Sequence, residues 1–185
     1  MVIPKSKDLA AASCRRTVYI IASLITLAVA LALAARSGEG EGVPAPDVVM
    51  RSIEGERLSF ADLRDQVVLV NFWATDCSVC LQEMPAMIET YRRFQPLGLE
   101  AIFIAMPYDR PDRVLHYARG NALPFKVVLD IQGEINQAFG IVRATPTTFL
   151  IDKRGRIVER ILGEPDFKRL HRLIDAKLGE AAGGI

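Results

Sequence analysis

Hydrophobic and polar positions divide the chain into an uncharged apolar run and a longer region of mixed pattern. Residues 17–35 (TVYIIASLITLAVALALAA) contain no charged side chain. A run of this length is long enough to cross a bilayer as a helix. From residue 47 onward, short apolar runs alternate with segments whose apolar residues recur every three or four positions. The sequence therefore predicts a membrane segment followed by a folded domain.

The pattern of the folded domain predicts an α/β fold. A hairpin is expected at residues 48–60, turning at Glu54-Gly55. Continuous apolar runs rich in β-branched residues predict buried strands at residues 66–73, 99–106 and 125–130. Helices are expected after Cys77 and at residues 111–121, 133–140 and 165–178. A second hairpin is expected at residues 147–152 and 156–162. This alternation indicates a central mixed sheet with helices on both faces.

Charge is distributed unevenly between the two parts. The chain of 185 residues has a formal net charge of +1. Residues 1–36 hold five basic side chains and one acidic one, so the remainder holds 18 Lys and Arg against 21 Asp and Glu. A surface that binds nucleic acid needs clustered positive charge, and this mildly acidic region shows none. Nucleic acid is therefore not expected as a partner.

The charges before the apolar run predict its orientation, because basic residues favour the cytoplasmic side. The four that precede it are Lys5, Lys7, Arg15 and Arg16. We expect a cytoplasmic tail (1–16), a transmembrane anchor (17–35), a flexible linker rich in Gly and Pro (36–46) and a globular domain (47–180). The alternative is a cleaved signal peptide, since Ala32-Leu33-Ala34 fits a cleavage site. Both interpretations export the globular domain.

Two cysteines, Cys77 and Cys80, follow the predicted strand 66–73 in a Cys-x-x-Cys spacing. A structural zinc site needs four ligands, and His116 and His171 fall on separate predicted helices, so bound metal is not expected. A structural disulfide across so short a loop removes little chain entropy. A redox pair fits better, because the N-terminus of a helix stabilises a thiolate. Cys77 is then the nucleophile, and Cys80 resolves the mixed disulfide.

The residues around this pair resemble a known family. Residues 68–85 (VLVNFWATDCSVCLQEMP) are similar to the active-site segment of the thioredoxin superfamily, most closely of its TlpA/ResA-like membrane-anchored thiol:disulfide oxidoreductases. The likeness extends from about Pro44 to Leu178 and includes the first hairpin, an insert after residues 101–106, and residues 143–152 (RATPTTFLID). The resemblance implies a thioredoxin-like fold with an N-terminal β-hairpin and a central insert. It also implies no cofactor besides the redox-active cysteine pair.

The resemblance assigns roles to further residues. Pro146 matches the cis-proline of the superfamily, and Thr145 before it is implied to pair through its backbone with a substrate chain. Trp73 either belongs to the core or, as a partly exposed side chain, helps to shape a substrate-binding surface at the thiol site. Two positions depart from the family pattern. Asp76 replaces an aromatic residue, and the dipeptide between the cysteines, Ser78-Val79, lacks the proline or glycine common in the family. Both positions help to set the reduction potential, and Asp76 disfavours a thiolate beside it.

Glu83 is a candidate catalytic proton carrier. Thioredoxins use a buried aspartate for this task, and by resemblance Asn71 occupies its position here. An amide cannot take up a proton in that role. Glu83 lies three residues after Cys80, so both share one helix face beside the apolar Met84. Glu83 is either the replacement acid, with a pKa raised by partial burial, or a solvated surface glutamate.

These observations predict an enzyme at the outer face of the cytoplasmic membrane that reduces disulfides in exported proteins. The resemblance implies apocytochrome c, as in cytochrome c biogenesis, or a copper-delivery protein as substrate. It also implies a membrane electron donor that re-reduces the pair. Two alternatives use the same cysteines. A disulfide-introducing oxidase differs in its reduction potential. A copper(I) chaperone needs a third ligand, for which Met84 and Met106 are candidates.

Overall fold

The computed structural model describes residues 42–181 of the chain. The expected cytoplasmic tail, the expected membrane segment 17–35 and the first part of the expected linker lie outside the described residues. Across residues 42–181, no helix combines the length and the apolar character that spanning a bilayer requires.

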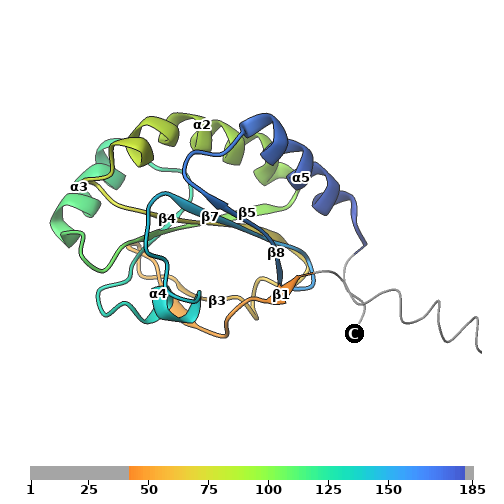
Figure 1. Cartoon of the computed structure of the whole chain (residues 1–185), viewed down its shortest axis with the longest axis horizontal. Coiled ribbons are helices and arrows are strands. Elements are labelled where there is room, and N and C mark those ends of the chain that lie inside the picture. The colour runs from red at the N-terminus through yellow and green to blue at the C-terminus, as the bar shows by residue number, and fades with distance from the viewer. Residues whose placement is uncertain (1–41, 182–185) are drawn as a thin grey trace, which may run out of the picture. The chain divides into compact units, whose positions relative to one another are not determined.

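Six strands form a mixed sheet at the centre of the domain (Figure 1): β1 (Val43–Pro44), β4 (Val67–Trp73), β5 (Leu99–Ala105), β6 (Lys126–Leu129), β7 (Thr147–Ile151) and β8 (Arg156–Leu162). Their order is β1-β8-β7-β4-β5-β6. The pairs β4–β5 and β5–β6 are parallel, whereas β7 runs antiparallel to both β4 and β8. Strands β2 (Val49–Arg51) and β3 (Arg57–Ser59) form a separate antiparallel hairpin.

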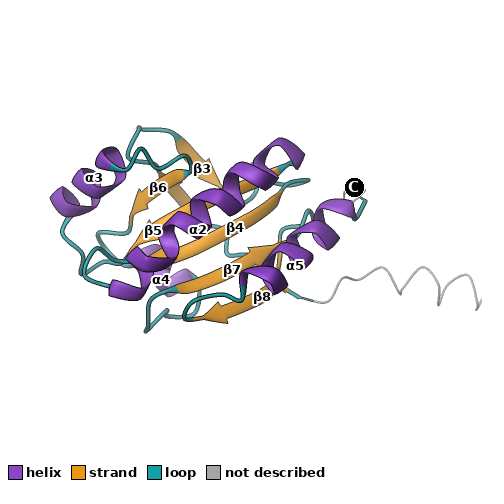
Figure 2. Ribbon diagram, turned by 90° about the horizontal axis from the view of Figure 1, so that it is seen from above, coloured by secondary structure: helices purple, strands orange, loops and turns teal. Residues whose placement is uncertain are grey.

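The side chains of β4 alternate between two hydrophobic cores, one on each face of the sheet. Val67, Leu69 and Trp73 belong to the core beneath three helices: α2 (Ser78–Phe94), α3 (Pro111–Gly120) and α5 (Phe167–Gly179). Residues 68, 70 and 72 belong to the opposite core, which the β2–β3 hairpin and α4 (Glu134–Ala138) cover. Figure 2 shows α2 and α5 lying across the sheet, with α3 at its β6 end. Because both faces are covered, β4 is buried along its whole length.

The predicted elements are found close to their predicted positions. Both hairpins form, and the first turns at Gly55, where a φ of 91° suits glycine. Helix α3 begins at Pro111 and ends at Gly120, as the helix-end signals predict. Helix α2 continues through Pro85, which is exposed. The expected mixed sheet with helices on both faces is confirmed.

One boundary is wrong. The expected flexible linker extends to residue 46, but Val43 and Pro44 form β1 and pair with Ile157 and Arg156 of β8. The backbone N–H of Ala45 also donates to the carbonyl oxygen of Gly155 at 2.9 Å. Without β1, β8 would be an edge strand with unpaired backbone groups. These groups pair with residues 43 and 44 where the chain enters the domain. A strand of two residues is too short to produce a hydrophobic period.

Candidate active site

The cysteine pair lies where the chain leaves β4 and enters α2. Cys77 and Cys80 form a disulfide with Cα atoms 5.3 Å apart. Cys77 is the N-cap of α2, and its Sγ accepts a hydrogen bond from the backbone N–H of Cys80 at 3.2 Å. Cys77 is half-buried, whereas Cys80 is fully buried. Cys77 is therefore the more accessible cysteine, and the unpaired N–H groups of the helix start favour a thiolate there.

A carboxylate holds the loop that precedes Cys77. Asp109, in the segment between β5 and α3, accepts two hydrogen bonds from Thr75, one from its backbone N–H and one from its hydroxyl, each 2.6 Å long. Asp109 was not among the predicted site residues. A signal existed, because β4 and β5 are parallel and polar residues that follow parallel strands meet at one edge of the sheet.

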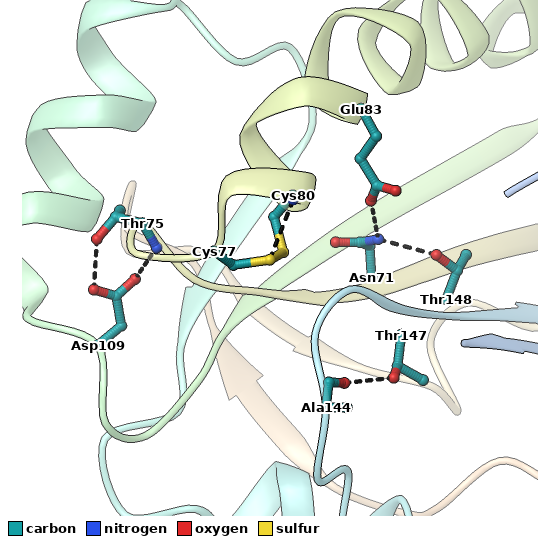
Figure 3. The surroundings of a disulfide bond; sticks show 9 residues. All are labelled: Asn71, Thr75, Cys77, Cys80, Glu83, Asp109, Ala144, Thr147 and Thr148. Carbon is teal, nitrogen blue, oxygen red and sulfur yellow. Dashed lines mark hydrogen bonds between the residues drawn. A yellow bond between two sulfur atoms is a disulfide. The ribbon is translucent and has the colours of Figure 1, made fainter. Parts of the chain in front are cut away.

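Glu83 lies in the interior on α2, with 2% of its surface exposed. The amide Nδ2 of Asn71 on β4 donates to Glu83 Oε1 at 3.1 Å and to Thr148 Oγ1 on β7 at 3.0 Å (Figure 3). The pKa of Glu83 is raised from 4.5 to about 7; burial is the largest cause, the hydrogen bond from Asn71 opposes it, and the negative charge of Glu164 adds to it. Glu83 is therefore a buried acid whose pKa lies near neutral pH, and its interpretation as a solvated surface residue is wrong.

The predicted docking segment lies at the start of β7. The Thr145–Pro146 peptide bond is cis, as the resemblance implies. The carbonyl oxygen of Pro146 accepts a hydrogen bond from Gly163 at 2.8 Å, and the hydroxyl of Thr147 donates to the Ala144 carbonyl at 2.6 Å. Thr145 is half-buried, and no other described residue forms a hydrogen bond with its backbone N–H or C=O. Those two groups are free to pair with a further chain.

Trp73 does not contribute to an exposed binding surface. Its side chain is completely buried and packs against Tyr117 of α3, with ring centroids 5.4 Å apart. The predicted substrate contact through Trp73 is therefore wrong. The reason is its position on β4, where α2 and α3 cover the face into which Trp73 points. Its Nε1 has no hydrogen-bond partner among the described residues.

The residues considered as metal ligands are spread over the domain. Met84 packs in the core beneath α2, while Met106 packs in the core on the opposite face of the sheet. His116 and His171 lie on α3 and α5, on separate helices as predicted. Within residues 42–181, no three His, Cys, Asp or Glu side chains converge on a common point. The methionines therefore give no support to the copper-chaperone alternative.

Comparisons with known proteins agree on the relationship. The model of the AhpC/TSA family matches residues 42–160. Thiol-disulfide oxidoreductase ResA of Bacillus thuringiensis subsp. konkukian is 35% identical over 131 residues, which cover 70% of this chain and 74% of that protein. ResA of Bacillus subtilis is 31% identical over 140 residues, covering 75% of this chain and 77% of the relative.

The solved structures extend this relationship to the fold. A thiol:disulfide interchange protein of the thioredoxin family from Chlorobium tepidum superposes with a TM-score of 0.68 at 26% identity. The match covers 77% of this chain and the whole of that protein. The cysteine pair at a helix start, the mixed sheet and these relatives agree. The chain therefore belongs to the AhpC/TSA family of thioredoxin-like proteins and is a ResA-like thiol-disulfide oxidoreductase.

Proposed function

We propose that this protein reduces disulfides in exported proteins at the outer face of the cytoplasmic membrane. Residues 17–35 anchor it, and a membrane electron donor returns its cysteine pair to the dithiol. The observation that carries the proposal is the asymmetry of the pair. Cys77 caps a helix and reaches the surface, whereas Cys80 is buried on the same helix as the acid Glu83.

The asymmetry supports a two-step exchange. In the reduced protein, the thiolate of Cys77 attacks a substrate disulfide, one sulfur of which leaves as a thiolate. The remaining mixed disulfide joins Cys77 to the substrate. Cys80 then loses its proton and attacks the sulfur of Cys77, which releases the second substrate thiolate. The substrate gains two electrons, and the pair becomes the disulfide seen in the structure.

Glu83 supports the second step, because a buried thiol needs a base before it can attack. Glu83 is one helical turn beyond Cys80, and its pKa of about 7 lets it accept a proton at neutral pH and release it afterwards. Asn71 occupies the strand position from which a carboxylate would otherwise act, and an amide cannot accept the proton. The proposal therefore assigns the base to Glu83.

The free backbone groups of Thr145 support a docking mode for the substrate. A substrate segment in extended conformation adds beside the start of β7 and pairs with these groups, as in β-strand addition. Backbone pairing is independent of side-chain sequence, which suits an enzyme that acts on several proteins. An apocytochrome c or a copper-delivery protein, each with a cysteine pair to be kept reduced, is the substrate class that the family resemblance favours.

The charges near the sulfurs support reduction over oxidation. Asp76 directly precedes Cys77, and Glu83 follows Cys80 by one turn. Negative charge disfavours a thiolate, and a less stable reduced form lowers the reduction potential of the pair. A disulfide-introducing oxidase needs the reverse, a thiolate stabilised beyond what the helix start alone gives Cys77. The reduction potential of the cysteine pair decides between the reductase and this oxidase alternative.

Trapping of the mixed disulfide tests the proposed reaction. The full chain with Cys80→Ser is expressed in a bacterial host, and covalent partners are identified after the free thiols are blocked with acid and alkylating agent. We expect exported proteins bound through Cys77, because no second thiol resolves them. The variant with both Cys77→Ser and Cys80→Ser is the control. Partners confined to cytoplasmic proteins would contradict the proposed location.

A reporter fusion tests the anchor separately. An enzyme that is active only outside the cytoplasm, fused after Asp47, is expected to be active and bound to the membrane fraction. A wholly soluble reporter that begins near Arg36 would support the cleaved signal peptide instead.

A further inference from the structure

The side chain of Asn71 is completely buried between β4 and α2, and only one end of its amide is paired. Nδ2 donates both of its hydrogen bonds, to Glu83 Oε1 at 3.1 Å and to Thr148 Oγ1 at 3.0 Å. Asn71 Oδ1 is buried without a partner in the described part of the chain, and so is Glu83 Oε2. Buried polar atoms without partners are uncommon and costly, so this arrangement calls for an explanation.

The unpaired end of the amide points toward the cysteines. Figure 3 shows the NH₂ end of Asn71 directed at Glu83 and Thr148, and Oδ1 directed to the side on which the Cys77–Cys80 disulfide lies. In this view the amide presents its NH₂ end to the buried acid and its oxygen to the side of the disulfide. In the disulfide, Cys80 has no S–H to donate to Oδ1. Reduction of the pair supplies such a donor.

Each protonation state of Glu83 selects one orientation of this amide. An ionised carboxylate only accepts hydrogen bonds, so it requires the NH₂ end, as in the structure. A protonated carboxyl has an O–H that donates, so it is satisfied by Oδ1. The two ends of an amide have nearly the same size, and the same space accommodates both. Thr148 permits either orientation, because its hydroxyl accepts from the NH₂ end and donates to the oxygen.

We propose that the side-chain amide of Asn71 rotates by half a turn as Glu83 gains or loses a proton. The rotation presents Oδ1 to Cys80 when its sulfur is a thiol and presents the NH₂ end when its sulfur is a thiolate. The proposal rests on the role of Glu83 in the proposed function. When Glu83 is ionised, Cys80 is a thiol and donates to Oδ1. When Glu83 has taken up the proton of Cys80 during exchange, Cys80 is a thiolate and accepts from the NH₂ end.

Protons and charge balance between Cys80 and Glu83. Cys80 gives up its S–H proton, Glu83 takes it up, and one negative charge moves from the acid to the sulfur. Asn71 neither gains nor loses a proton, and it is a positioning residue for both partners. Glu164, in the segment before α5, is the other charged group that bears on Glu83, and its negative charge favours the protonated acid. The amide thus offsets the cost of a thiolate in a buried position.

The orientation of the amide can be observed directly. The full chain carries ¹⁵N-labelled asparagine and ¹³C-labelled glutamate, and the reduced protein is titrated from about pH 5 to 9 by NMR, a range that spans the pKa of about 7. Through-space contacts from the Asn71 NH₂ protons report which way the amide faces. We expect contacts to the γ-protons of Glu83 at high pH and contacts to the β-protons of Cys80 at low pH. The change should share its midpoint with the Glu83 carboxyl signal.

The possible results separate this proposal from the proposed function. If Glu83 titrates near pH 7 while the Asn71 contacts stay the same, the amide switch is wrong and Glu83 still serves as the base. If the Glu83 carboxyl does not titrate in this range, both the base and the switch are wrong. In Glu83→Gln, whose side chain cannot ionise, the Asn71 contacts should become independent of pH. Contacts that still change with pH in that variant would overturn the coupling.

Two substitutions test the consequence for exchange. Thr148→Val removes the hydroxyl that satisfies either orientation, and we expect disulfide exchange to slow by roughly tenfold with a shifted pH midpoint. Thr90→Val is the matched control, because it also removes a fully buried threonine hydroxyl, bonded instead to Ala86 and His171. Equal rates and equal pH midpoints in the two variants would overturn the proposal.

Discussion

Both oxygens of the Asp109 carboxylate accept hydrogen bonds from Thr75, one from the backbone and one from the side chain. The contact joins the loop after β5 to the loop that carries the chain from β4 into Cys77. Two bonds of 2.6 Å to a charged group restrain this loop more strongly than neutral contacts would. Cys77 therefore meets its substrate from a fixed position at the start of α2.

Replacing Asp109 should weaken this restraint. We expect Asp109→Ala to lower the free energy of unfolding by about 1–3 kcal/mol, the range for hydrogen bonds to a charged group. The same variant should also show a changed rate of Cys77 alkylation. Urea unfolding and labelling kinetics provide the two measurements. Asp112→Ala is the control, because that carboxylate is exposed and its ion pair with the exposed Arg110 carries little energetic weight. Equal effects in both variants would contradict the account of Asp109.

The two thiols should differ in reactivity. The full chain is reduced and treated with a limiting amount of alkylating agent, after Cys14→Ser has removed the third cysteine of the sequence. We expect label on Cys77 well before Cys80, because Cys77 is accessible and caps the helix while Cys80 is completely buried. Peptide mapping identifies the labelled cysteine. Label that reached Cys80 first would reverse the roles assigned to the two sulfurs.

The raised pKa of Glu83 predicts how stability depends on pH. In the unfolded chain this carboxyl loses its proton near pH 4.5, but in the folded protein it keeps it until about pH 7. Between these values the folded state binds more protons, so stability falls as pH rises. Each pKa unit corresponds to about 1.4 kcal/mol, which gives a loss of about 3 kcal/mol by pH 8.

Glu83→Gln should remove this dependence, since glutamine does not ionise. We expect its stability relative to the unsubstituted protein to rise by about 3 kcal/mol between pH 4 and pH 8, measured by urea unfolding of the oxidised chains. Glu89→Gln makes the same change at an exposed position of α2 and should leave the difference flat. A flat difference for Glu83→Gln as well would mean that Glu83 ionises normally in the folded protein.

Exchange kinetics test whether the same acid moves a proton. Glu83→Gln should slow the resolving step by about a hundredfold, the lower part of the usual contribution of a general base. The pH dependence near 7 should disappear with it. The measurement is the rate at which the reduced chain reduces a disulfide-bonded peptide between about pH 5 and 8. A variant that matched the unsubstituted protein throughout this range would leave Glu83 with a structural role only.

Local patterns predicted most of this fold because most of its elements produce strong local signals. The strand 67–73 is a continuous apolar run, α3 is bracketed by Pro111 and Gly120, and the Cys-x-x-Cys spacing marks the redox centre. The burial of Glu83 was one of two alternatives, and the neighbouring Met84 correctly favoured it. These features depend on residues close together in the sequence.

The features that were missed depend on contacts between distant segments. Thr148 joins the Asn71–Glu83 network only because β7 pairs with β4 in a register that places Thr148 opposite Asn71. Asp109 reaches Thr75 because β4 and β5 end at the same edge of the sheet. Trp73 has an amphipathic side chain suited to a surface site, and only the packing of α3 over β4 shows it to be buried.

The reduction potential of the Cys77–Cys80 couple tests the central claim most directly. The full chain with Cys14→Ser is equilibrated with thiol–disulfide buffers of defined potential, and the oxidised fraction is read after the thiols are trapped. Because carboxylates near both sulfurs disfavour the thiolates, the account predicts a reducing couple near the value of thioredoxin, about −270 mV. A potential near that of the oxidase DsbA, about −120 mV, would contradict it and identify the protein as a donor of disulfides.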